Sequence, residues 1–231
     1  MEEPTTATIS VYEAIHTTRA VRRLRPDPIP DDVLLRILTA FGHGPSGGNR
    51  QPWRLIAVRD PEARRALQAM HAAVWSSYAD HSRAQLQALP EPARARAERS
   101  VRAGDYLADH LHEVPVLVVV CFDPGGLAIT DARLDRPSVV GGASIYAAVQ
   151  NLLLACRAEG LGCVLTTLLC AREPEIRALL QIPEPWATAA FVPIGYPVGR
   201  GHGPLSRRPI ESLLFEDRFG NPLRLSGPKA P

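Results

Sequence analysis

The stretch GHGPSGGNRQPW, residues 42–53, decides which fold class the chain can adopt. Three of its glycines have the spacing G-x-G-x-x-G of a dinucleotide-binding loop, which must leave a strand and open a helix. Upstream, residues 31–41 place their apolar side chains on one face of a helix. Downstream, Pro52 prevents a helix from continuing, and the apolar run 55–58 is typical of a buried strand. Because the order is helix, loop, strand, the sequence excludes a Rossmann loop. It also excludes a Walker loop, since no Gly-Lys-Ser or Gly-Lys-Thr follows.

The composition of the 231 residues is that of a folded globular domain, with 45% hydrophobic and 22% charged residues. The longest apolar run, 114–122, is far shorter than the roughly 20 residues of a membrane helix. The first ten residues carry acid where a signal peptide carries base. We therefore expect a single cytoplasmic domain without membrane association.

The basic residues have an unusual composition. The net charge is only +2, yet Lys229 is the only lysine, so 25 of the 26 basic residues are arginine. Arginine enrichment fits a bias in genome composition, and it also suits anion binding, because guanidinium groups bind phosphate bidentately and stay charged. Nucleic-acid binding is not expected, because aromatic residues are only 6% of the chain and acidic residues interrupt each basic cluster.

Neither the cysteines nor the histidines have the spacing of a metal site. The four cysteines form no C-x-x-C pair and lie in apolar runs, which favours buried, reduced thiols. The sequence DHLHE, residues 109–113, places its two histidines on different faces of a helix. We predict no metal site.

Hydrophobic periodicity and the positions of Pro and Gly predict one domain of helices and strands. A helical stretch at 61–112, broken at Pro90 and Pro92, is an excursion from the core and a candidate lid. The run 115–121 is expected to be a central strand covered on both faces, and helix 143–159 has so little polar surface that it should be buried. The other predicted helices are 11–16, 31–41, 173–180 and a short one near 211–215, and the other predicted strands are 55–58, 163–167 and 189–194.

Three segments stand out for their arginines and small residues: TTRAVRR at 17–23, PSGGNRQPW at 45–53 and SRRP at 206–209. Each alone fits solvated surface charge or a plain turn. In this order, however, they resemble the FMN-dependent nitroreductase family over residues 10–220. The family's R-R-S-V-R segment is matched by Thr18-Arg19-Ala20-Val21-Arg22, and its P-S-x-x-N-x-Q-P-W motif by the second segment.

The resemblance implies an α+β fold with a mixed β-sheet flanked by helices. It also implies an intertwined homodimer with two FMN sites at its interface and NAD(P)H as the transient hydride donor. Residues 1–9 would form a flexible leader, and the extension 195–231 would embrace the partner subunit.

The same resemblance implies which residues bind the cofactor. The arginine-rich segments at both ends would meet the phosphate and ribityl chain, with Arg22 near the flavin pyrimidine end, where a cation favours the anionic reduced state. The glycine loop would come from the partner subunit, with Gly47 letting the backbone approach the cofactor. Backbone N–H groups at the end of strand 163–167 would contact the isoalloxazine. The predicted cofactor-binding set is Thr18, Arg19, Ala20, Arg22, Pro45, Ser46, Gly47, Asn49, Leu165, Thr166, Thr167, Arg207 and Arg208.

Thr18 and Ala20 depart from the arginine and serine of the family pattern. One phosphate donor and one hydroxyl are therefore missing, and Arg208 is available to compensate. We still predict tight FMN binding.

The implied mechanism is ping-pong: NAD(P)H passes hydride to flavin N5, and an electron-poor small molecule, such as a nitroaromatic or a quinone, then accepts the electrons. No side-chain nucleophile is required, so no catalytic residue is assigned. The alternatives are a specialised member, such as a reductive dehalogenase, an enone reductase or a flavin-fragmenting enzyme, and a flavin-binding protein without turnover. Trp75, Tyr78 and Tyr106 either line the acceptor pocket or only pack between helices.

Overall fold

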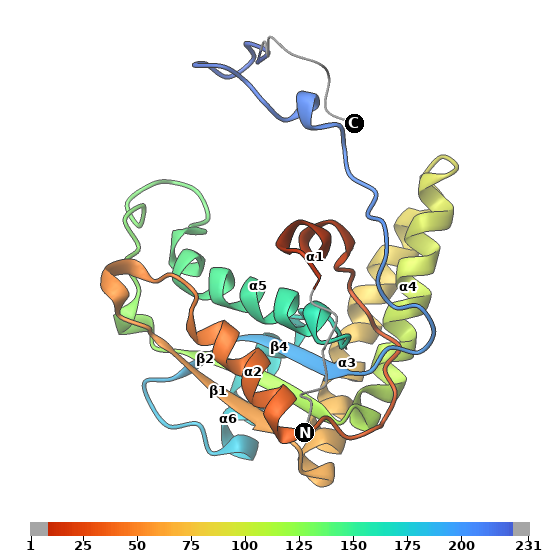
Figure 1. The fold of residues 1–231 in the computed structure, drawn as a ribbon, viewed down its shortest axis with the longest axis vertical. Coiled ribbons are helices and arrows are strands. Elements are labelled where there is room, and N and C mark those ends of the chain that lie inside the picture. Colours follow the sequence, from red (N-terminus) through yellow and green to blue (C-terminus); the bar gives the residue numbers. More distant parts are fainter. Residues whose placement is uncertain (1–8, 224–231) are drawn as a thin grey trace, which may run out of the picture.

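The computed structural model describes residues 9–223, and Figure 1 shows a sheet enclosed by helices. The helices are α1 (Val11–Thr17), α2 (Asp31–Gly42), α3 (Pro61–Leu86), α4 (Ala93–His110), α5 (Ala143–Ala158) and α6 (Glu173–Leu180). The strands are β1 (Trp53–Val58), β2 (Val116–Phe122), β3 (Gly162–Cys163) and β4 (Ala187–Gly195). The order helix, loop, strand around residues 42–53 is thus confirmed.

The sheet runs in the order β1-β2-β4-β3, and each neighbouring pair is antiparallel. Among the described residues, parallel pairing occurs at the isolated bridge between Ala20 and Cys163. One face of the sheet packs on α2 and α5, and the other face packs on α3, α4 and α6. The predicted α+β class is confirmed.

β2 lies inside the sheet and is covered on both faces, as its unbroken β-branched run predicted. Alternate residues of a strand point to opposite faces, so an apolar run supplies two cores at once. Val116, Val118 and Val120 pack toward α2 and α5. Leu117, Val119 and Cys121 pack toward α3, α4 and α6.

The predicted helical excursion is a pair of long helices, α3 and α4, which lie side by side. The Asp60 side chain caps α3 by accepting a hydrogen bond of 2.7 Å from the backbone N–H of Ala63, and Pro61 occupies the first helical position. Pro90 and Pro92 lie between the two helices, where the sequence placed the break.

The predicted strand 163–167 is wrong in length, because β3 ends at Cys163. The register between β3 and β4 returns at Thr166, which exchanges two backbone hydrogen bonds of 2.9 Å with Phe191. In this register Val164 lies opposite Pro193, which has no N–H to donate to it. A proline on the neighbouring strand therefore interrupts the ladder.

Two other predictions need correction. The short helix expected near 211–215 is a single 3-10 turn, Ile210–Ser212. Helix α5 buries only one stripe of residues against the sheet, and its outward face is partly exposed in the isolated chain.

The extension after β4 passes along α4 and then leaves the body of the molecule. The predicted leader and the last residues of the extension, 1–8 and 224–231, lie outside the described residues.

Across residues 9–223, every helix is too short or too polar to cross a bilayer.

Candidate functional site

The segment after β3 leaves part of the sheet edge open. The N-terminal segment covers the beginning of this edge, where the Val21 N–H donates a hydrogen bond of 2.9 Å to the Cys163 carbonyl. Beyond it, the backbone of Thr166 is fully used by its pairing with Phe191. Because N–H groups alternate in direction along an extended chain, those of Leu165 and Thr167 point away from β4. Within residues 9–223, neither of them donates a hydrogen bond.

This result refines the prediction for the strand end. Leu165, Thr166 and Thr167 were expected to form the segment whose backbone N–H groups contact the isoalloxazine. Thr166 has none to offer, because its N–H is bonded within the sheet. Leu165 and Thr167 are exposed and carry the two open donors.

A cavity of about 240 Å³ lies beside this open edge, and we call it the polar cavity. Its walls are Arg22 from the N-terminal segment, His71, Trp75 and Tyr78 from α3, Gly104 and Leu107 from α4, and residues 164–168. The fold thus brings the predicted Arg22 together with the predicted strand-end segment, although the two are far apart in the sequence.

Arg22 is the cation of the polar cavity. Burial lowers the pKa of its guanidinium, and the neighbouring Tyr78 offsets part of that effect. An arginine still stays protonated at neutral pH, because its ordinary pKa is far above 7. The cavity therefore presents a fixed positive charge next to two open backbone donors.

His71 lies in the wall of the same cavity and is almost fully buried, with 1% of its surface exposed. Its Nδ1 has no hydrogen-bond partner in the part of the chain that the structure describes. Burial lowers the pKa of the imidazole to about 4, so the ring is neutral at physiological pH.

Trp75 is held rigidly in the wall between α3 and α4. Its indole N–H donates a hydrogen bond of 2.8 Å to the Asp105 carboxylate, which also accepts one of 2.6 Å from Arg83. The ring packs directly over Gly104, where a Cβ would lie 2.9 Å from Cε2 and closer still to Cζ2 and Cη2. Only glycine leaves room for this indole position. The Tyr106 ring, in contrast, stacks on His110 and carries Arg23 over its face, and it takes no part in the wall.

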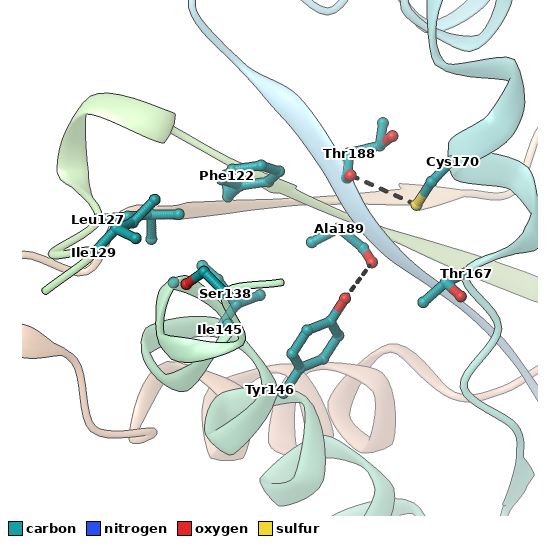
Figure 2. Close-up of a pocket in the computed structure, with 12 residues that line it drawn as sticks. Phe122, Leu127, Ile129, Ser138, Ile145, Tyr146, Thr167, Cys170, Thr188 and Ala189 are labelled. Atoms are coloured by element: carbon teal, nitrogen blue, oxygen red, sulfur yellow. Dashed lines mark hydrogen bonds between the residues drawn. The ribbon is translucent and has the colours of Figure 1, made fainter. Parts of the chain in front are cut away.

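A second and larger cavity, of about 580 Å³, lies on the other side of Thr167, and we call it the apolar cavity. Figure 2 shows its lining: Phe122, Leu127, Ile129 and Ile145 supply apolar side chains, and Thr167, Tyr146 and Cys170 close one side. The Tyr146 hydroxyl donates a hydrogen bond of 3.1 Å to the Ala189 carbonyl, and the Cys170 thiol donates one of 3.5 Å to the Thr188 carbonyl. Burial raises the pKa of both groups, so both are protonated at neutral pH. Thr167 lines both cavities.

The rest of the predicted N-terminal set precedes Arg22 in the chain and is engaged by other parts of the chain. The Thr18 hydroxyl donates a hydrogen bond of 2.7 Å to the Ala14 carbonyl, and Ala20 forms the parallel bridge to Cys163. The Arg19 guanidinium donates to the Pro204 carbonyl through two nitrogens. Arg19 therefore ties the C-terminal extension to the N-terminal segment.

Arg207 and Arg208 are exposed on the C-terminal extension. Arg96 of α4 donates a hydrogen bond of 3.4 Å to the hydroxyl of Ser206, which holds this part of the extension against the helix. Both arginines thus project from the chain beside the α3–α4 pair.

The predicted loop 45–49 lies away from the polar cavity and from the arginines of the C-terminal extension. Its Gly47 N–H donates a hydrogen bond of 3.0 Å to the Ser144 hydroxyl at the start of α5, and Figure 1 shows this end of α5 remote from α3 and α4. Ser46 accepts a hydrogen bond of 3.0 Å from the Gln51 N–H, and Asn49 adopts a left-handed φ of 54°. One chain does not bring the loop to its own polar cavity.

The fold requires Gly44 for close packing, although the family motif does not include it, and Gly48 for its left-handed φ of 58°. A Cβ on Gly44 would lie 2.8 Å from the Ala148 backbone nitrogen and closer to its Cα and Cβ. A Cβ on Gly47, predicted to permit close backbone approach, would meet only the Ser144 hydroxyl oxygen at an ordinary 3.7 Å.

The model of the Nitroreductase family matches residues 15–196. The chain belongs to the Nitroreductase family. It is 31% identical over 216 residues to an NADH dehydrogenase of Thermus thermophilus, in a match that covers 92% of this chain and 98% of the relative. It is 30% identical over 209 residues to a 5,6-dimethylbenzimidazole synthase of Rhodospirillum rubrum, with 89% and 88% covered.

The fold agrees with this assignment. A nitroreductase with bound FMN from Desulfitobacterium hafniense superposes with a TM-score of 0.63 at 20% sequence identity, covering 90% of this chain and 98% of that one. The family predicted from the three spaced segments is confirmed, and the protein is an oxidoreductase of the nitroreductase family.

Family motifs gave no sign of His71, of Gly104 or of the apolar cavity. His71 had one usable signal, because Leu67, His71 and Trp75 recur at intervals of four residues and so share one face of α3. A histidine on the buried face of a helix is expected to have a hydrogen-bond partner. Whether it has one is decided by residues far away in the sequence.

Proposed function

We propose that this nitroreductase-family protein is an FMN-dependent NAD(P)H:acceptor oxidoreductase that works as a homodimer. The observation that carries the proposal is the open sheet edge at Leu165 and Thr167, with the Arg22 guanidinium beside it and a cavity on each side. When bound, FMN accepts hydride from NAD(P)H and passes the electrons to an electron-poor acceptor.

The two cavities fit the two ends of an isoalloxazine ring. The uracil end carries carbonyl oxygens and becomes anionic when the flavin is reduced, which suits a cavity with a cation and backbone donors. The dimethylbenzene end is apolar, which suits the cavity lined by Phe122, Leu127 and Ile145. Thr167 lies between the two environments, where the middle of a long flat ligand would rest.

The chain's own residues hold and polarise such a ligand. The N–H groups of Leu165 and Thr167 are fixed by the pairing of Thr166, so they donate without reorganisation. Arg22 supplies a positive charge in a partly dry environment, where charge has a larger effect than in water. Trp75, locked by Gly104 and Asp105, excludes water from one wall.

The phosphate of the cofactor needs cations as well. Arg19 is near the polar cavity, and Arg207 and Arg208 lie on the extension that Arg19 ties down. We infer that these three arginines bind the phosphate and that the backbone at Thr18 and Ala20 contacts the ribityl chain. The missing family arginine at Thr18 is then offset by the two arginines of the extension.

The homodimer is inferred from the position of loop 45–49, which is ordered against α5 but remote from the polar cavity of its own chain. We propose that Pro45, Ser46, Gly47 and Asn49 complete the site of the partner subunit. Large apolar side chains exposed on α1 and on the C-terminal extension support association: Val11, Tyr12, Ile15, Ile210, Leu213, Phe215 and Phe219. Light scattering on FMN-loaded protein tests this, and a monomer that retains FMN would contradict it.

The visible absorption spectrum of the purified protein, before and after addition of NADH or NADPH, tests the function. We expect flavin bands that bleach rapidly with one or both donors and return with nitroaromatics or quinones. A colourless protein that does not quench the fluorescence of added FMN would refute cofactor binding. Bound flavin that neither donor bleaches would instead indicate a flavin-binding protein without turnover.

A specialised flavin enzyme is the second candidate. The two relatives described above carry different activities at nearly the same identity, 31% and 30%, so overall similarity does not choose between a reductase and a synthase. Reoxidation by a panel of acceptors, with the flavin products analysed by chromatography, separates them. Regeneration of intact FMN by many acceptors supports the reductase, and loss of FMN during turnover supports the specialised enzyme.

A further inference from the structure

The buried imidazole of His71 has no structural task that the fold explains. A buried polar group normally has a hydrogen-bond partner, because leaving one unpaired costs roughly 1–3 kcal/mol. Nδ1 of His71 has none within residues 9–223, although the side chain is 1% exposed. The ring lies in the wall of the polar cavity rather than between packed helices alone. Nδ1 is closed to solvent, so the ring nitrogen that a ligand in the cavity can reach is Nε2, which also makes no hydrogen bond within residues 9–223.

The surroundings restrict what that ligand presents to the ring. The Arg22 guanidinium and the open N–H groups of Leu165 and Thr167 are donors, and the Leu165 carbonyl, on the same side of the chain as its N–H, is the backbone acceptor beside them. The hydroxyls of Tyr78 and Thr167 can donate as well. A ligand edge that fits them carries acceptor oxygens. A neutral imidazole also has an N–H, so His71 extends the same set of donors without adding a charge.

We propose that His71 is a cofactor-binding residue whose imidazole N–H donates a hydrogen bond to a carbonyl oxygen of the flavin uracil edge. This inference rests on the proposed function and goes beyond it, because it assigns a specific contact to a residue outside the family motifs. Reduction places negative charge on that edge, so the donor stabilises the reduced flavin more than the oxidised one. Arg22 and His71 then act on the same flavin edge: Arg22 contributes a positive charge, and His71 contributes a directional hydrogen bond.

The variants His71→Leu and His71→Gln test the contact. Leucine removes both ring nitrogens at a similar volume, and glutamine keeps an N–H donor. His81→Leu is the matched control, because His81 lies on the same helix but is exposed and outside the cavity. The measurements are FMN affinity, the flavin midpoint potential, and infrared spectra of bound FMN labelled with ¹³C at C2 or C4.

With His71→Leu we expect FMN binding weaker by about 2- to 12-fold, which corresponds to the loss of one ordinary hydrogen bond. The midpoint potential should fall, and one labelled carbonyl band should shift to higher wavenumber. His71→Gln should recover part of each change, and His81→Leu should cause none of them.

The melting temperature of the FMN-free protein distinguishes a ligand-binding histidine from a structural one. His71→Leu removes an unpaired buried polar group, so the FMN-free variant should melt at the same temperature as the unmodified protein or higher. A histidine with a structural hydrogen bond would lose stability on the same change.

The outcomes separate the two hypotheses. If the unmodified protein binds FMN and His71→Leu keeps its affinity and carbonyl bands, the contact is refuted and the proposed function stands. If the unmodified protein does not bind FMN, both are refuted. If His71→Leu does not fold, His71→Phe takes its place, because phenylalanine keeps a planar ring without nitrogen atoms. Unchanged carbonyl bands in that variant refute the contact, and a shifted band that His71→Gln partly restores supports it.

Discussion

The substitution Gly104→Ala should change the shape of the polar cavity, because it displaces the Trp75 ring that forms part of the cavity wall. An ideal Cβ at this position would lie 2.9 Å from Cε2 and closer to two other indole carbons, whereas ordinary carbon contacts are about 3.5–4.0 Å. The ring must therefore retreat by about 1.5 Å to clear its two nearest carbons, or α3 and α4 must separate. Overpacking of this kind costs roughly 1–3 kcal/mol, and loss of the Trp75–Asp105 hydrogen bond adds about 1 kcal/mol. The better helix propensity of alanine returns about 1 kcal/mol, so the net loss should be roughly 1–3 kcal/mol.

Thermal unfolding measures this loss, at roughly 2–4 °C for each kcal/mol in a domain of this size. Gly42→Ala is the matched control, because it also changes a helical glycine but its Cβ would meet nothing within 4 Å. We expect the control to be unchanged or slightly more stable and Gly104→Ala to lose both stability and FMN affinity. Adding Trp75→Phe should recover part of the stability by giving the methyl group room. A Gly104→Ala protein that melts like the control and keeps the same tryptophan fluorescence would refute the clash with Trp75.

Three further predictions concern pH, charge and the loop. The fold lowers the pKa of His71 to about 4. As the pH falls, the unfolded chain therefore binds a proton at this residue at a higher pH than the folded chain does, which favours unfolding. The FMN-free protein should therefore lose roughly 2 kcal/mol of stability between pH 7 and pH 5 from this group, and urea titrations of His71→Leu should lack that share. Arg22→Met should lower the flavin midpoint potential while Arg22→Lys keeps most of it, and equal potentials in the two variants would contradict the role of the charge. Gly44→Ala should push the loop off Ala148 and weaken dimerisation and FMN binding together, as seen by light scattering and by flavin titration; full binding would refute the loop assignment.

Most of the fold could be predicted because its signals are local. The helix-loop-strand order around residues 42–53, the Asp60 cap and the short helix α6 each depend on neighbouring residues alone. The length of β3 could not be predicted that way. Its interruption opposite Val164 is caused by Pro193, which lies on another strand and becomes a neighbour only in the folded sheet.

The sequence predicted the site residues that belong to family motifs, but it did not predict the contacts that hold those residues in place. Arg22 and the strand-end segment were found because the family motifs contain them, and the fold brings them together. The engagement of Arg19 by the Pro204 carbonyl depends on the path of the C-terminal extension, and sequence patterns do not show that path. The role of Gly104 depends on which side chain of α3 lies opposite it.

Three locally unfavourable features meet around one short segment of the chain. Pro193 removes a ladder hydrogen bond opposite Val164, Arg22 is a partly buried cation, and His71 keeps an unpaired nitrogen in the same cavity wall. Each one alone lowers stability, and a sequence under selection for stability alone would be free to remove it. A ligand with acceptor oxygens at the open edge of Leu165 and Thr167 would make Arg22 and His71 useful, whereas Pro193 ends the regular ladder beside that edge. The concentration of these costs at one place is thus a physical argument for a binding site there, and it is independent of the resemblance between the arginine-rich segments and those of the family.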